Sequence, residues 1–320
     1  MTNGNRLLPT TSVVPARVML FQATQRPTFR KGKWVETSWG RCKVEGRMGQ
    51  RHADVLEISQ YCAELMRKED GGTIRLLVDP AKVRRMMSDD LYSEQQLWKL
   101  LKDMRESTIE IDTPAIRLMG GVIESAAKAK HRTARNPFVT RFAPTPSPPT
   151  LHGDQRKKRA GEVIATARDR KLWVIRLGLG WTELMRLDLP LYYDPAPIAR
   201  LQFGISQAVV RHVLTHSHAP NGGWTIDGLI SAVAGDLRGQ KRRDARRNVH
   251  ADAARIAAIG IVVERDRVYR AGIGLDGRSV GQPPGSVGQP PGSVGQPPGS
   301  VGQPPGETAS LQDLQGPSGP

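Results

Sequence analysis

Cysteine, aromatic residues and long apolar runs are all scarce in this sequence of 320 residues. The two cysteines, Cys42 and Cys62, lack the CxxC spacing of zinc sites and are too few for a disulfide framework. No stretch approaches the roughly 20 apolar residues that span a bilayer, and the N-terminus lacks the apolar core of a signal peptide. We therefore expect a soluble protein of a reducing compartment, the cytoplasm, without a membrane partner.

Acidic residues are also in short supply, because 31 aspartates and glutamates oppose 47 lysines and arginines, a formal net charge of +16. Residues 279–320 hold no Lys or Arg and two acids, Glu307 and Asp313, so the positive surplus lies upstream of them. Each phosphate that a cation contacts releases condensed counterions, so a surplus of this size favours a polyanionic partner. Nucleic acid is the partner that the charge predicts.

Motifs for enzymatic chemistry are missing as well. No G-x-x-x-x-G-K-[ST] phosphate loop occurs, and Gly178-Leu179-Gly180 lacks the third glycine of a dinucleotide fingerprint. His216-Ser217-His218 and Tyr192-Tyr193 suggest the HxH element and tyrosine of rolling-circle nicking enzymes, but the histidines fall at an expected helix end. We expect no catalytic residue, no metal and no cofactor, and keep the nicking enzyme as the less favoured alternative.

Residues 237–270 carry the densest positive charge of the chain, with six cations in ten residues and only Asp244 against them. A helix here would turn one apolar stripe inward, namely Ala245, Val249, Ala253 and Ile256. Its opposite face would carry Gln240, Arg243, Arg247 and His250, flanked by Arg242 and Arg246. Gly260 ends the helix, and 261–263 can pair with 268–269 across a turn. Such a helix followed by a basic hairpin is typical of the recognition helix and wing of a winged helix-turn-helix.

Residues 49–124 show a similar order with less charge. We predict a helix from Gly49 to Lys68, a strand over 74–78, a short helix opened by Asp79-Pro80, and a helix over 94–106 with a Ser93/Gln96 capping box. Two strands, 108–111 and 116–123, follow. The 94–106 helix would then be a recognition helix, although an ordinary surface helix remains open as the alternative.

The second half repeats this order. We predict a strand over 172–177 that continues through 181–193, a helix from Asp194-Pro195 to about His216, a short strand over 224–226 and a helix capped by Asp227. The cationic helix and the hairpin come next. The fold class is therefore α+β, with tandem winged helix-turn-helix domains.

The predicted organisation has five parts. Residues 1–30 form a flexible arm, 31–125 a first winged-helix domain for dimerisation and DNA, 126–165 a basic proline-rich connector, 166–275 a second winged-helix domain for the main DNA contact, and 276–320 a disordered tail. The tail contains four copies of SVGQPPG, each with two prolines, two glycines and a single valine to bury. Such a composition cannot offset the entropy of ordering the chain, and the role of the repeats stays open.

Two winged helices in one basic chain without an ATP motif resemble the RepA and TrfA class of plasmid replication initiators, those of IncW-type plasmids most of all. The resemblance covers about Trp34 to Arg270. It rests on WGRCKVEGRMGQRHADVLEI, LWKLLKDMRESTIEI, FGISQAVVRHVLTH, WTIDGLISAVAG and RRDARRNVHADAARIAAIGIVVERDRVYR. The long connector and the SVGQPPG tail depart from many members of the class, so functions tied to them are not implied.

The resemblance implies a bacterial DNA-binding protein. It implies binding as a monomer to iterons, the short direct repeats of double-stranded DNA at a plasmid origin, with both domains in successive major grooves. It further implies help in melting the origin, recruitment of the host replication initiator and helicase, and a monomer–dimer equilibrium in which dimers repress or are inactive. A winged-helix transcriptional regulator is the alternative. Tandem modules favour the initiator, since regulators usually obtain two modules by dimerising.

The residues expected at the DNA lie on the second cationic helix and its hairpin and on the 94–106 helix. They are Arg238, Lys241, Arg242, Arg243, Arg246, Arg247, His250, Arg265, Arg267, Arg270, Gln95, Lys99, Lys102 and Arg105. Arginine forks suit guanine edges, whereas the hairpin arginines suit phosphates. Arg243 or Arg247 is the hypothesised base reader.

Overall fold

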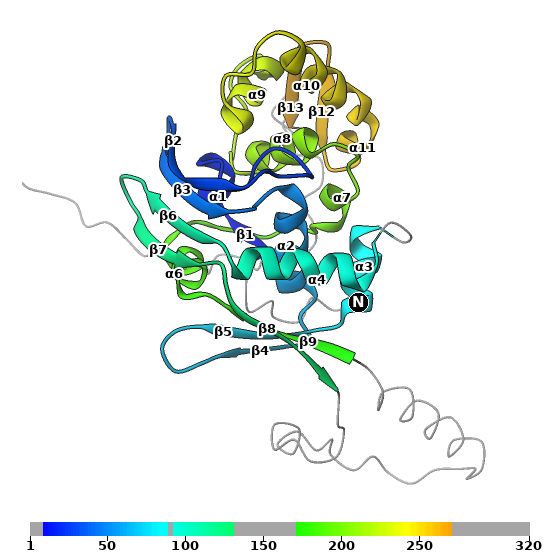
Figure 1. Ribbon diagram of the computed structural model, residues 1–320. Helices are drawn as coiled ribbons and strands as arrows, with labels where there is room; N and C mark the ends of the chain where they lie inside the picture. The colour runs from blue at the N-terminus through cyan, green and yellow to red at the C-terminus, as the bar shows by residue number, and fades with distance from the viewer. Residues whose placement is uncertain (1–8, 89–91, 131–170, 271–320) are drawn as a thin grey trace, which may run out of the picture. The chain divides into compact units, whose positions relative to one another are not determined.

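The computed structural model describes residues 9–88, 92–130 and 171–270 (Figure 1). Helices and antiparallel sheets alternate along these residues, so the predicted α+β class is confirmed. The SVGQPPG repeats and residues 131–165 of the predicted connector lie outside the described residues.

Two four-stranded antiparallel sheets organise the described residues before 196, which we call the first half. The first has the order β2-β3-β6-β7, with strands Arg30–Thr37, Gly40–Gly46, Thr108–Asp112 and Arg117–Gly121. The second has the order β4-β5-β9-β8, with strands Leu65–Lys68, Ile74–Val78, Lys171–Leu177 and Ile123–Lys130. Burial alternates along β3, where Cys42 and Val44 are fully buried, because successive side chains of a strand point to opposite faces.

Three of the helices that pack with these sheets are α2 (Gln50–Cys62), α3 (Pro80–Met87) and α4 (Glu94–Arg105). The predicted helix starts are confirmed. The Asp79 carboxylate accepts from the Ala81 N–H at 2.9 Å, and Ser93 and Gln96 exchange hydrogen bonds of 3.2 and 2.8 Å. The predicted extension of α2 to Lys68 is wrong, since residues 65–68 pair with β5 instead.

Strand β9 corrects the predicted domain boundary. Its residues pair with β5 on one side and β8 on the other, for example Ile175 with Leu76 and with Ala126, so β9 lies inside the sheet of the first half. The second domain therefore does not begin at residue 166, and 126–130 belong to β8 rather than to a connector. Pairing between strands so distant in sequence leaves no local signal, which is why the apolar run alone misplaced the strand.

The segment after β9 is also corrected. Residues predicted to continue a strand form α6 (Leu179–Leu187), and only β10 (Pro190–Leu191) is extended. Gly120 and Gly180 let α6 approach β7 closely, because a Cβ added to Gly180 would lie 2.9 Å from the Gly120 Cα. Trp181 and Leu184, three positions apart, are both fully buried. A short apolar run such as 181–184 fits either a buried strand or a helix, and tertiary packing decides between them.

The described part of the predicted flexible arm is ordered. Strand β1 (Thr11–Ser12) pairs with β10, α1 (Val14–Arg17) follows, and Val18 and Leu20 are fully buried. The low periodicity of this segment reflects short elements that are held by distant partners. The prediction of flexibility is therefore wrong for residues 10–30.

Residues 196–270, which we call the second half, build their own core from five helices and a small sheet. The helices are α7 (Ala196–Ala199), α8 (Gly204–Leu214), α9 (Ile226–Ala234), α10 (Gly239–Ala251) and α11 (Ala253–Ala257). The sheet has the order β11-β13-β12, with strands Trp224–Thr225, Arg267–Arg270 and Ile261–Glu264. The predicted pairing of 261–263 with 268–269 is confirmed, since Val262 pairs with Tyr269 and Val263 with Val268, and the strands extend one pair further to Glu264 and Arg267. The two long helices predicted here are each divided, into α7 and α8 and into α10 and α11.

Candidate nucleic-acid interface

Helix α10 has the two faces that its sequence predicts. Val249 is fully buried and Ala245 nearly so, and both belong to the core of the second half. Gln240, Arg243, Arg247 and His250 are all exposed on the other side. We call these four residues the outer face of α10. Apolar packing on the opposite side leaves this face exposed to a partner.

Arg242 and Arg246 bind other parts of the protein. An Nη atom of each lies near the Asp227 carboxylate of α9, at 3.1 Å for Arg242 and 3.4 Å for Arg246, and Arg246 also donates to Asp266 in the hairpin turn. These contacts join α9, α10 and the turn between β12 and β13. Both arginines, predicted as DNA contacts, therefore already hold the cationic helix against its neighbours.

The remaining cations of α10 are less engaged. The side chains of Lys241, Arg243 and His250 are exposed and make no hydrogen bond or ion pair with another described residue. Arg247 lies 2.9 Å from Asp244 one turn earlier, but its side chain is 74% exposed. Exposed pairs of this kind are worth about 0.2–1 kcal/mol, so Arg247 can leave Asp244 at little cost. Arg238, just before the helix, pairs with Asp236 in the same exposed manner.

The hairpin presents one cation at its tip. Arg265 occupies the turn with a positive φ of 48° and is exposed. Arg267 donates from Nη1 to the Gly223 carbonyl at 3.3 Å, and Arg270 donates to the His216 carbonyl. Of the three predicted hairpin contacts, Arg265 is therefore the most available to a phosphate, while the other two brace the strand against the loop before β11.

Helix α4 carries three lysines and arginines, against five in α10. Leu97, Leu101 and Met104 are fully buried, as the predicted inward stripe requires. The predicted outward residues are all exposed, namely Gln95, Lys99, Lys102 and Arg105. Arg105 lies 3.7 Å from Glu106. The outward side of α4 therefore holds three cations and a glutamine, with an acid beside one of the cations. The structure brings these residues together on one helix, apart from the α10 set.

The break between α10 and α11 has a specific cause. Asp252 is fully buried, and its carboxylate accepts from the backbone N–H groups of Gln202 and Phe203, both at 3.1 Å, at the start of α8. Arg255 donates to the same carboxylate at 3.2 Å. The side chain thus caps a different helix from its own. The sequence gives no sign of this role, because a lone aspartate within a helical pattern is normally exposed.

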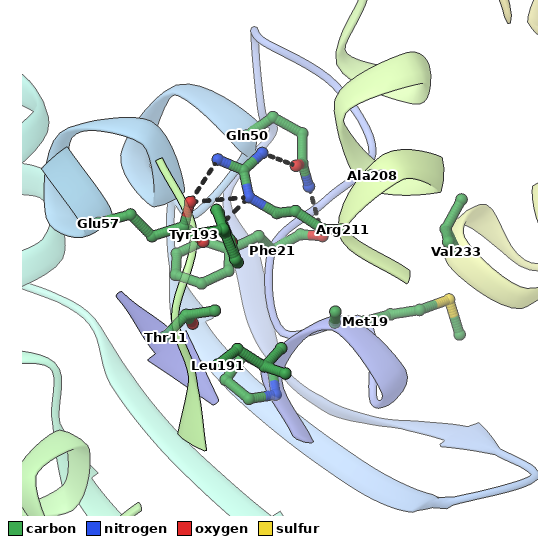
Figure 2. Close-up of a pocket in the computed structure, with 12 residues that line it drawn as sticks. Thr11, Met19, Phe21, Gln50, Glu57, Leu191, Tyr193, Ala208, Arg211 and Val233 are labelled. Carbon is green, nitrogen blue, oxygen red and sulfur yellow. Dashed lines mark hydrogen bonds and ion pairs between the residues drawn. The ribbon is translucent and has the colours of Figure 1, made fainter. Parts of the chain in front are cut away.

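A buried charge cluster joins α8 to α2 and was not predicted. The Arg211 guanidinium is 2.6 Å from Asp54, 2.9 Å from Glu57 and 2.8 Å from the Gln50 amide oxygen, and Arg211 is only 5% exposed. Figure 2 shows Gln50 and Glu57 converging on the guanidinium. Burial alone would lower the pKa of Arg211, but the Glu57 and Asp54 carboxylates outweigh it and hold that pKa well above its usual value.

A small cavity adjoins this cluster. It encloses about 20 Å³ and is lined by residues that include Thr11, Met19, Phe21, Tyr193 and Arg211 (Figure 2). That volume holds roughly one water molecule and excludes a metabolite. The cluster and cavity therefore serve the packing of α2 against α8 rather than a substrate. A polar stripe at 50, 54 and 57, spaced four and three residues apart, was the sequence signal that could have revealed the α2 side.

The histidines considered for metal binding have other surroundings. The His216 ring packs on Trp39, Trp224 and His212, and its Nδ1 lies 2.9 Å from the His212 carbonyl oxygen. Within the described ranges, no group of three His, Cys, Asp or Glu side chains is arranged to hold a metal ion. No helix in those ranges combines the length and apolarity needed to cross a membrane. No protein-family model matches this chain, and no curated protein or solved structure is detectably similar to it.

Proposed function

We propose that this protein binds double-stranded DNA through α10 and initiates replication of a plasmid by recognising direct repeats at its origin. In this proposal the second half is a winged helix-turn-helix domain. Helix α10 is its recognition helix, the β12–β13 hairpin is its wing, and α9 packs behind as the supporting helix. The first half is a related domain in which α4 takes the recognition position.

The outer face of α10 is the observation that carries the proposal. It places Arg243, Arg247 and His250 on a helix whose opposite side is anchored in the core. The contacts of Arg242 and Arg246 with Asp227 hold that helix in a fixed position. A rigid helix with exposed arginine forks suits the edge of guanine in the major groove, and Arg265 at the hairpin tip suits a neighbouring phosphate.

Two modules in one chain support the initiator over a regulator. The buried contacts between Arg211 and the α2 carboxylates join the halves, so one chain can present two helices to DNA without dimerising. A site read this way needs no two-fold symmetry, which agrees with direct rather than inverted repeats. Recruitment of a host initiator and helicase, and self-association through the first half, follow from the resemblance and belong to the same proposal.

A replication assay in trans tests the function. The DNA beside the gene is cloned into a plasmid that cannot replicate in the host, and the full chain is supplied from a second plasmid. We expect replication only when the chain is present, and its loss with an Arg243→Ala/Arg247→Ala variant. Binding to that DNA without replication would favour the transcriptional regulator, while absence of binding to any duplex would reject both.

A further inference from the structure

Two grooves meet beside α10, where the N-terminal segment lies against the second half. The first is lined by residues of 19–35 and of α10, among them Arg26, Arg30, Lys241 and Asp244. The second is lined by residues of the first half and of 199–202, among them Arg51, Arg200 and Arg255. Gln25 and Gln202 line both grooves, and Gln25 Nε2 donates to the Gln202 carbonyl at 2.9 Å. We call the combined feature the seam groove.

Positive charge dominates the seam groove. Six of its lining residues are lysine or arginine, and Asp244 is the acid among them. Arg200 donates to the neutral carbonyl of Arg85, and Arg26 is exposed without an ion pair to another described residue. Two of the six are paired with acids, Arg51 with Asp54 and Arg255 with Asp252, both at 3.2 Å. The other four have no acid partner among the described residues, so the protein leaves most of the charge in the groove without a counter-charge.

The distribution of the cations indicates the chemistry of the ligand. They come from separate segments along an open groove instead of converging on one point, which suits a linear polyanion better than a single small anion. Lys241 belongs to both α10 and the groove, so a strand held at the outer face of α10 can continue into it. A phosphodiester backbone is a linear polyanion with regular spacing.

We propose that the seam groove binds the phosphodiester backbone of the nucleic acid that α10 holds, with Arg26, Arg200 and Lys241 contacting phosphates. This rests on the proposed DNA binding by α10 and adds a second contact to it. The backbone can belong to the flank of the same duplex or to a single strand, and both offer the same chemistry to the groove.

Salt dependence of binding tests the seam groove. The full chain is titrated with a fluorescent 30-base-pair duplex of random sequence and with a 30-nucleotide thymidine strand at several salt concentrations. The groove variant is Arg26→Gln/Arg200→Gln. The control variant, Lys68→Gln/Lys171→Gln, removes two exposed cations from β4 and β9 and so matches the change in charge. Thermal melting confirms that each variant is folded.

The groove variant should have a less steep salt dependence than the control. Losing two phosphate contacts lowers the slope of log K against log salt by about 1.8 on duplex, or about 1.4 on single strand. A change on duplex alone assigns the groove to the duplex flank, and a change on the thymidine strand alone assigns it to single-stranded DNA. Equal slopes for groove and control variants on both probes would overturn the seam proposal. Wild-type protein that binds neither probe would reject DNA binding itself.

Discussion

Neighbouring arginines on α10 have different tasks because they point in different directions. Arg242 and Arg246 contact Asp227, whereas Arg243 and Arg247 point outward. Sequence periodicity predicted these directions, since one residue along a helix rotates the side chain by about 100°. It could not predict the partner, because Asp227 lies on α9 and comes into reach only after the helices pack. The division separates the arginines that stabilise the domain from those that are free to read DNA.

Substitution of each type should therefore have a different effect on stability. Arg246→Ala removes contacts with Asp227 and Asp266 and should destabilise the fold by about 1 kcal/mol, since the side chains are roughly one-third exposed or more. Arg243→Ala removes no contact to described residues and should change stability by less than about 0.5 kcal/mol. Urea unfolding of both variants measures this. Equal losses would show that Arg246 does not brace the helix.

At the level of elements, the strongest predictions were the local ones. The starts of α3 and α4 and the β12–β13 hairpin are each determined by residues a few positions apart, such as Ser93 and Gln96 at the start of α4. The elements that depend on distant partners were missed. Strand β9, helix α6 and the N-terminal segment are all placed by partners far away in the sequence, such as β10 for β1 and β5 for β9. Local pattern carries no information about such partners.

The break at Asp252 gives a prediction at this scale. Asp252→Ala leaves the Gln202 and Phe203 N–H groups without their acceptor at a partly buried position, which should cost about 1–3 kcal/mol. Asp252→Asn keeps one acceptor oxygen and should cost less than Asp252→Ala. The midpoint of urea unfolding measures both. An unchanged midpoint for Asp252→Ala would mean that the carboxylate does not stabilise the start of α8.

At the scale of the molecule, Arg211 is the residue that ties the halves together. Replacing it with methionine leaves Glu57 buried without a counter-charge and Asp54 paired with Arg51 alone, and we expect a loss of about 3–5 kcal/mol. Adding Glu57→Gln removes the uncompensated carboxylate and should restore part of that stability. Chemical denaturation of the single and double variants measures both effects. A single variant as stable as wild type would contradict the role of the cluster.

Stability of the whole molecule should also depend on pH. Burial, aided by nearby His216 and Arg17, lowers the pKa of His212 from 6.5 to about 4. The unfolded chain therefore binds a proton near pH 6.5 that the folded chain binds only near pH 4, so stability is complete above about pH 6.5 and falls as the pH drops toward 4. The loss from this group is up to about 3 kcal/mol. His212→Gln should flatten thermal stability between pH 4 and 6.5, and an unchanged profile would contradict the assignment.

The account as a whole depends on α10 reading bases, and selection of duplexes from a randomised pool tests this most directly. Wild-type protein should enrich a defined motif that contains guanine at one or more positions. Arg243→Ala/Arg247→Ala should still bind duplex but lose preference at those guanines, at a cost of about 1–3 kcal/mol for each base-reading arginine. Recovery of the same motif by both proteins, with the same preference at every position, would contradict the assignment of α10 as the recognition helix.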